Sequence, residues 1–196
     1  MGTLMRAAVL CAVGGLAAAQ SNPSETEPIS HGERWKWAVT STIGPASLAG
    51  GLVSAGLGTW MDQPREYDTN WKGFGKRYGM RLTGVSVSNT MEAGLGAVWG
   101  EDPRYPRAEG QPFKNRVAHV VKMTFLAPYR EGQIGPAYER YAAIGGNNFI
   151  SNAWRADSEA TVDRAAIRIG LGFLGRMASN AFLEFWPDVK DRISKH

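Results

Sequence analysis

Three side chains in this sequence could supply acid–base chemistry: Glu92, Asp102 and His119. Glu92 stands in a segment of small and apolar residues. Burial among such neighbours raises the pKa of a carboxyl group unless a cation pairs with it. Glu92 could therefore act as a general acid, or it could pair with Arg168 or Arg176 from another helix.

The two arginines favour the structural role for Glu92. Arg168 and Arg176 are eight positions apart in a glycine-rich segment, so a helix would place them on roughly the same face. A pair between Glu92 and one of these arginines would clamp two helices together and fix their register. We therefore predict a paired Glu92, with a functional carboxylate as the alternative.

The other two candidates have simpler explanations. Glu101 and Asp102 lie in a proline-flanked loop. Two carboxylates could perform glycosidase-type chemistry there. A turn after a helix explains the same residues without such chemistry, and we favour it. His119 has no second histidine at helical spacing that could complete a metal site, and no G-x-S-x-G pattern supplies a serine for a triad. We predict no metal and no cofactor. A periplasmic hydrolase that uses Glu92, Asp102 and His119 remains the alternative function.

Small residues recur at helical spacing in three stretches, 43–59, 83–98 and 165–181. Gly, Ala and Ser four positions apart allow helix backbones to approach closely. In the first stretch one face of a helix would carry four such residues, and we predict that they form a helix contact. These residues are Ala46, Gly50, Ser54 and Gly58.

The elements that must position these residues are predicted to be helices. Ordered structure is expected to begin near Glu33, and the break at 44–45 starts a helix that ends near residue 61. Further helices are expected over 71–99, 113–126 and 142–154. Because no segment sustains a period-two alternation, we expect no strands. The predicted fold is all-α, a compact bundle of about five helices.

The last helix is expected to start at a cap on Ser158 and to end or kink at Pro187. An apolar stripe at helical spacing is expected to face the core of the bundle. The stripe consists of Ile167, Leu171, Leu174, Ala178, Phe182 and Phe185.

The N-terminus has the pattern of a secretory signal over residues 1–19, in which Arg6 precedes a short apolar run and a small-residue cleavage site. Cys11 lies inside this segment, so the mature chain would form no disulfide. Residues 20–32 are polar and are expected to form a flexible tail before a single helical domain at 33–196. The net charge of +4 is too small to indicate a nucleic-acid partner. We expect export to the periplasm or outer envelope.

Membrane association has several weak signals. The uncharged run 38–61 is long enough to cross a bilayer, but its glycines and hydroxyls lower its hydropathy, so crossing is disfavoured. Tryptophans near helix ends are expected to cap the bundle rather than to form an interfacial belt. A basic cluster could face anionic head groups, with an ordinary solvated helix face as the alternative. The cluster consists of Lys72, Lys76, Arg77 and Arg81.

Three motifs are spread over most of the chain: FGKRY at 74–78, EDPRY at 101–105 and EFWPD at 184–188. Together they resemble a family of signal-bearing bacterial envelope proteins with glycine- and alanine-rich helices. The resemblance implies export and a helical fold, and it implies no activity, ligand or site residue.

These observations predict an exported structural or interaction protein that is associated with a membrane. Its expected partner is membrane lipid or another envelope protein, and a homo-oligomer is possible. A carrier of a lipid or small apolar ligand is the alternative binding function, and it would require helices that enclose an apolar pocket.

Overall fold

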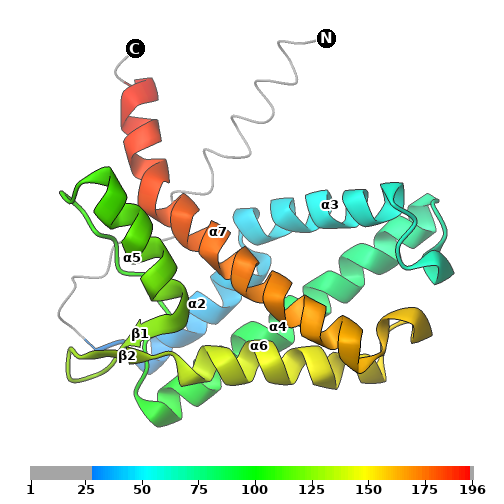
Figure 1. Cartoon of the computed structure of the whole chain (residues 1–196), viewed down its shortest axis with the longest axis horizontal. Coiled ribbons are helices and arrows are strands. Elements are labelled where there is room, and N and C mark those ends of the chain that lie inside the picture. The colour runs from blue at the N-terminus through cyan, green and yellow to red at the C-terminus, as the bar shows by residue number, and fades with distance from the viewer. Residues whose placement is uncertain (1–27, 195–196) are drawn as a thin grey trace.

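The computed structural model describes residues 28–194, which fold into helices packed along a long central helix, α4 (Figure 1). The all-α prediction is confirmed, with the exception of one small hairpin. The expected signal at 1–19 and residues 20–27 of the expected tail lie outside the described residues. The elements in chain order are α2 (His31–Ile43), α3 (Pro45–Trp60), η2 (Arg65–Tyr67), α4 (Trp71–Trp99), α5 (Phe113–Phe125), β1 (Leu126–Pro128), β2 (Ile134–Pro136), α6 (Tyr138–Ile150), η3 (Ser151–Ala153), η4 (Asp157–Glu159) and α7 (Val162–Ser194).

Two long helices organise the packing. Helix α4 packs against α2, α3 and α6, while α7 packs against α5 and α6. In Figure 1, α7 crosses the molecule diagonally, and its C-terminal turns run beside α5 toward one end. Charged side chains on α4, α6 and α7 are therefore brought to the middle of the molecule from segments far apart in the sequence.

The start of α2 is fixed by a capping box. The Ser30 Oγ accepts a hydrogen bond from the Glu33 N–H (3.2 Å), and the Glu33 carboxylate accepts one from the Ser30 N–H (2.9 Å). Ile29 is buried just before the cap. The expected boundary of the flexible tail at residue 32 is therefore a few residues too late, because residues 28–32 already belong to the folded part.

The predicted start of α7 is wrong, and so is the first of the two alternatives for Pro187, that the helix ends there. Thr161 caps the helix by accepting the Arg164 N–H at 3.3 Å, whereas Ser158 binds the Glu66 carboxylate instead. At the other end α7 continues through Pro187 to Ser194. A proline removes one helical hydrogen bond, but here the turns on both sides of Pro187 are held by ion pairs to α5, described below.

The hairpin of β1 and β2 was not expected from the sequence. The two strands are antiparallel, with Leu126 opposite Pro136, and they connect α5 to α6. Each strand has three residues. Such a strand is too short to produce a recognisable alternation of apolar and polar residues.

Large apolar side chains lie on the outside of this fold, and charged side chains lie inside. The largest fully buried side chains include Arg140, Glu101, Glu139 and Glu184. The apolar stripe predicted to face the core along α7 is instead exposed over its first half, where Ile167 is 56% exposed and Leu171 is 59% exposed. The buried face of α7 carries Ala165, Asn180 and Glu184. A period of 3.6 locates an apolar face but not the direction in which it points.

The small-residue contact of α3 is displaced by one position from the prediction. Gly51 and Ala55 are buried, whereas Ala46, Gly50 and Ser54 are exposed. A Cβ atom at Gly51 would lie 2.7 Å from the Tyr78 ring, so only glycine allows α4 to approach this closely. Gly58, the fourth predicted residue, is partly buried against Gln63 and Arg77.

The tryptophans differ from the prediction that they cap the bundle. Trp37 is buried, but Trp60 and Trp71 are 81% and 86% exposed. These two residues end α3 and begin α4, so they lie at the same tip of the α3–α4 helix pair (Figure 1). Within residues 28–194, no helix combines the length and the apolar character that a membrane crossing needs.

Candidate functional site

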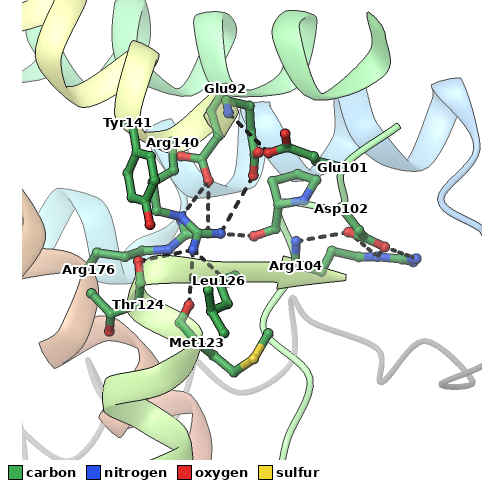
Figure 2. A network of polar contacts seen from close by, with 12 residues as sticks. Glu92, Glu101, Asp102, Arg104, Met123, Thr124, Leu126, Arg140, Tyr141 and Arg176 are labelled. Carbon is green, nitrogen blue, oxygen red and sulfur yellow. Dashed lines mark hydrogen bonds and ion pairs between the residues drawn. The ribbon is translucent and has the colours of Figure 1, made fainter. Parts of the chain in front are cut away.

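The centre of the molecule holds one carboxylate between two arginines. Glu92 Oε1 lies 3.1 Å from Arg140 Nε and 2.9 Å from Arg176 Nη2 (Figure 2). Glu92 is on α4, Arg140 is on α6 and Arg176 is on α7, so one oxygen atom joins three helices. All three side chains are mostly buried. Arg176 was predicted from the sequence as a partner of Glu92, whereas Arg140 was not.

Arg140 also closes the end of α5. Its Nη1 donates to the backbone carbonyls of Met123 (3.0 Å), Thr124 (3.2 Å) and Leu126 (3.2 Å), as Figure 2 shows. The last carbonyl groups of a helix have no partner within the helix, and a cationic donor satisfies them. One guanidinium thus neutralises Glu92 and terminates α5. The Glu92–Arg140 ion pair is therefore part of a network of structural hydrogen bonds rather than of an open catalytic site.

Arg176 is held by three different kinds of contact. In addition to Glu92, its Nη2 donates to the Pro103 carbonyl at 2.5 Å, and its guanidinium lies 5.6 Å from the centre of the Trp37 ring. Burial and, to a smaller extent, the neighbouring Arg140 lower the pKa of Arg176 to about 10, against the opposing effect of Glu92. Such a group still carries its charge at neutral pH, and Glu92 is the carboxylate that compensates it.

A second buried carboxylate lies beside this centre. Glu101 accepts hydrogen bonds from the Tyr129 hydroxyl and from the Glu139 N–H, both at 3.0 Å. Burial raises the pKa of Glu101 above its ordinary value, although these hydrogen bonds and Arg140 counteract it. Nearby, a Cβ atom at Gly96 would lie 2.7 Å from Nη1 of the buried Arg34, so glycine is required where α2 crosses α4.

The second and third sequence motifs meet in a separate ion-pair cluster. Glu184 accepts hydrogen bonds from the Tyr105 hydroxyl (2.8 Å), the Ala108 N–H (3.0 Å) and Arg116 Nε (2.6 Å). Asp188, one turn later, binds the other side of Arg116 at 2.5 Å. These bonds tie the C-terminal part of α7 to α5 on both sides of its internal proline.

The three residues proposed for hydrolysis do not share a site. Asp102 Oδ2 binds Arg104 Nη2 at 2.7 Å, and its Oδ1 accepts the Arg104 N–H at 2.9 Å, which is the geometry of a turn. His119 Nε2 lies 2.9 Å from the Pro106 carbonyl, and its ring meets Tyr105 edge to face. Glu92 is engaged by two arginines. In the described part of the chain no hydrogen bond or ion pair joins any two of these three side chains, so they do not form one site.

Arg168 has different partners from those predicted. It donates to the Asn148 carbonyl at 3.0 Å, to Asn152 Oδ1 at 2.5 Å and to the Glu159 carbonyl at 2.6 Å. It therefore holds the segment after α6 rather than Glu92. Across the described part of the chain, no group of three or more His, Cys, Asp or Glu side chains could hold a metal ion.

The basic cluster of α4 is divided between the surface and the interior. Lys72 and Lys76 are exposed, but Arg77 is buried, and it donates to the carbonyls of Gln63 (2.7 Å) and Pro64 (2.8 Å). Arg81 also points inward. The prediction of four cations on a membrane-facing surface is therefore wrong for the two arginines. Lys72 and Lys76 share one face of α4, whereas Arg77 and Arg81 lie on another face, which packs against α3.

An open cleft of about 1080 Å³ lies between α3, α4, α6 and α7. Five arginines and two glutamates line it, and Arg176 and Glu92 are among them. The small residues predicted as a helix contact, Ala46, Gly50, Ser54 and Gly58, line this cleft. Asp102 and His119 are not among its lining residues. No pattern in the sequence predicted this cleft, since its walls come from four separate helices.

No protein-family model, curated protein or solved structure matches the chain. The resemblance based on the three motifs therefore stays a prediction. The geometry explains what the motif residues do in this chain: Arg77 holds a loop, while Tyr105 and Glu184 bind one another.

Proposed function

We propose that this protein is an exported interaction protein that docks on an anionic membrane surface through the tip of the α3–α4 helix pair. The single observation that carries the proposal is the pair of highly exposed indoles, Trp60 and Trp71, at this tip. Amphipathic indole rings favour the boundary between lipid head groups and acyl chains. Met61 is also exposed at the same tip.

Charge at the tip supports lipid as the partner. Lys72 and Lys76 follow Trp71 on the first turns of α4, and both are exposed. Lysines near a membrane surface each contribute about 1 kcal/mol to binding of anionic lipids. Apolar rings beside cations are the composition of a surface that inserts shallowly and binds head groups.

The wider distribution of apolar side chains also favours lipid over a second copy of the chain. Exposed large apolar residues occur on each of α2 to α7, for example Val39 on α2, Phe113 on α5 and Ile193 on α7. A two-fold dimer interface would cover one self-complementary patch. Exposed apolar side chains spread over several helices do not form one such patch.

Flotation with lipid vesicles tests this proposal. The protein is expected to float with vesicles of phosphatidylcholine and phosphatidylglycerol, to float less with phosphatidylcholine alone, and to be released by salt. The double variant Trp60→Ala, Trp71→Ala is expected to lose flotation. Trp35→Ala is the matched control, because Trp35 is also exposed but lies on α2, away from the tip.

Three results would count against the proposal. The protein could fail to float with anionic vesicles, the tip variant could float as well as the parent, or Trp35→Ala could reduce flotation as much as the tip variant. A dimer seen by light scattering that disappears in the tip variant would instead assign the two indoles to a contact between copies.

A further inference from the structure

We propose that the cleft between α3, α4, α6 and α7 is a binding site for an oxyanion, a phosphate or carboxylate group, carried by an amphiphilic ligand. Arg81 and Arg155 bind the oxyanion, and the apolar wall of the cleft binds the remainder of the ligand. The cleft reaches the loop that joins α3 to α4, but the proposed site rests on Arg81 and Arg155 rather than on Trp60 and Trp71, and it does not depend on membrane docking.

The charges of the cleft are unbalanced in favour of an anion. Its lining holds Arg77, Arg81, Arg155, Arg168 and Arg176 but only Glu92 and Glu159 as carboxylates. Excess positive charge in a cleft with low-dielectric walls attracts and concentrates anions.

The hydrogen bonds separate these arginines into two groups. Arg77 and Arg168 each donate from all three guanidinium nitrogens. Arg176 donates through Nη2 to Glu92 and to the Pro103 carbonyl, so its charge is paired although its buried Nε has no partner among the described residues. In the described part of the chain, Arg81 donates one hydrogen bond, to the Ser47 carbonyl (2.9 Å), and Arg155 donates one, to Ser151 Oγ (3.0 Å). Most N–H donors of these two guanidinium groups are therefore available to a ligand.

Both available arginines border the same face of α4. Gly84 is three positions after Arg81, which places it one turn along on that face. A Cβ atom at Gly84 would lie 3.8 Å from Arg155 Nη2 and 3.8 Å from Asn147 Nδ2. The absence of a side chain at Gly84 thus leaves a hollow bordered by nitrogen donors from α6 and from the segment after it.

A buried amide faces the same cleft without a complete set of partners. Asn147 is buried and lines the cleft, and its Oδ1 has no hydrogen-bond partner among the described residues. Buried polar atoms are normally satisfied, and because Oδ1 is an acceptor it requires a donor, which a water or a ligand hydroxyl can supply and the oxyanion itself cannot. Burial also lowers the pKa of Arg81 and of Arg155, and a bound anion would offset this cost.

The rest of the cleft is suited to an apolar group. Its lining includes Val85 on α4 and Leu171, Phe182 and Leu183 on α7. The side chain of Leu171 is 59% exposed. Arginines beside an apolar wall match a molecule with an anionic head and a hydrocarbon portion, and concave sites of this kind fix ligands with a few placed polar groups.

Calorimetric titration of the full folded protein distinguishes the possible sources of the oxyanion. The probes are dodecyl phosphate below its micelle concentration, inorganic phosphate, and dodecyl maltoside as an uncharged amphiphile. Dodecyl phosphate is expected to bind at least about tenfold more tightly than either of the others. Binding of inorganic phosphate with equal affinity would overturn the amphiphile and assign the site to a soluble oxyanion. Equal binding of dodecyl maltoside would overturn the oxyanion site.

Substitutions locate the site. Arg81→Gln and Arg155→Gln are each expected to weaken binding of dodecyl phosphate about 10- to 100-fold, the loss typical of a charge-assisted hydrogen bond. Arg192→Gln removes the same charge from an exposed position near the end of α7 and is expected to leave binding unchanged. Unchanged binding in the Arg81→Gln, Arg155→Gln double variant would overturn the proposal.

Gly84→Asp tests the site even if an arginine variant fails to fold. Its Cβ fits at ordinary contact distances, and its carboxylate would occupy the proposed position of the oxyanion beside Arg155. This variant is expected to lose binding of dodecyl phosphate while keeping or raising the melting temperature. Gly84→Asn is the matched control, since asparagine has the same shape as aspartate without its charge. The melting temperature of Gly84→Asn is expected to be lower than that of Gly84→Asp. A lower melting temperature for Gly84→Asp than for Gly84→Asn would contradict the proposal.

Discussion

Nη2 of Arg176, on the last helix, lies 2.9 Å from Oε1 of Glu92, on the central helix, although 84 positions separate them in the chain. Both side chains are mostly buried, and Arg140 binds the same carboxylate oxygen from a third helix. Removal of one member of a buried ion pair leaves an uncompensated charge in a low-dielectric interior. The stability of the helix arrangement is therefore expected to depend strongly on this carboxylate.

We expect Glu92→Gln to lower the free energy of unfolding by about 3–5 kcal/mol, because two buried arginines lose their shared counter-charge. Urea denaturation followed by circular dichroism measures the change. Glu109→Gln is the control: Glu109 is 58% exposed, and Arg107, its partner, also pairs with Asp188, so loss of the solvated carboxylate is expected to cost about 0–1 kcal/mol. Equal effects of the two substitutions would show that the buried centre has no special role.

We expect the close approach of α3 and α4 to make Gly51 sensitive to a single added methyl group. Gly51→Ala places Cβ 2.7 Å from the Tyr78 ring, whereas Gly56→Ala, on the same helix, meets nothing within 4 Å. Both variants gain the same helix propensity, so the difference between their unfolding free energies isolates the steric cost of about 1–3 kcal/mol. Thermal denaturation of both proteins provides the comparison, and equal melting temperatures would refute the contact.

Local signals in the sequence predicted the helical class and several helix boundaries. Proline at position 45 marks the start of α3, and the segment 71–99 was located to the residue, since it lies between a polar turn and a proline-rich loop. The Glu92–Arg176 partnership was also within reach of sequence reasoning, because a carboxylate in an apolar segment requires a counter-charge.

The sequence alone could not predict which face of each helix points toward the interior. The periodicity of α7 identifies two faces, but it cannot say that Leu171 and Leu174 lie outside while Glu184 lies inside. The small-residue face of α3 was one position out of register for the same reason. Arg140 was missed as a partner of Glu92 because only the hairpin between α5 and α6 brings it to the centre.

We expect Arg77 to be essential for the loop between α3 and α4, although the sequence places it beside two exposed lysines. Arg77→Met removes the donors to the Gln63, Pro64 and Asp68 carbonyls and is expected to lower the free energy of unfolding by at least about 2 kcal/mol. Limited proteolysis should also cut the loop faster in this variant.

Lys72→Met is the matched control for Arg77→Met. Lys72 is exposed near the start of the same helix, and surface substitutions of this kind change stability by about 0.5 kcal/mol or less. If Lys72→Met destabilises the protein as much as Arg77→Met, the hydrogen bonds of Arg77 are not the cause.

Two of the buried glutamates, Glu184 and Glu101, are expected to give opposite dependences of stability on pH. Burial by itself would raise the pKa of Glu184, but hydrogen bonds from Arg116, Ala108 and Tyr105 outweigh it and hold the pKa below the ordinary value of 4.5. The stabilisation from ionised Glu184 is therefore complete above pH 4.5 and is lost as the pH falls through the lowered pKa. For Glu101, burial raises the pKa above 4.5, so its contribution decreases as the pH rises from 4.5 through the raised pKa.

Unfolding free energies of the parent, Glu184→Gln and Glu101→Gln between pH 3 and pH 8 separate these contributions. The difference between the parent and Glu184→Gln is expected to shrink as the pH falls below about 4.5, because protonation removes the ion pair with Arg116 that the substitution already lacks. The difference between the parent and Glu101→Gln is expected to change in the opposite sense above about pH 4.5. If the difference between the parent and Glu184→Gln instead grows as the pH falls, then hydrogen bonds to Glu184 do not outweigh its burial, and the contact between α5 and α7 is not held by an ionised carboxylate.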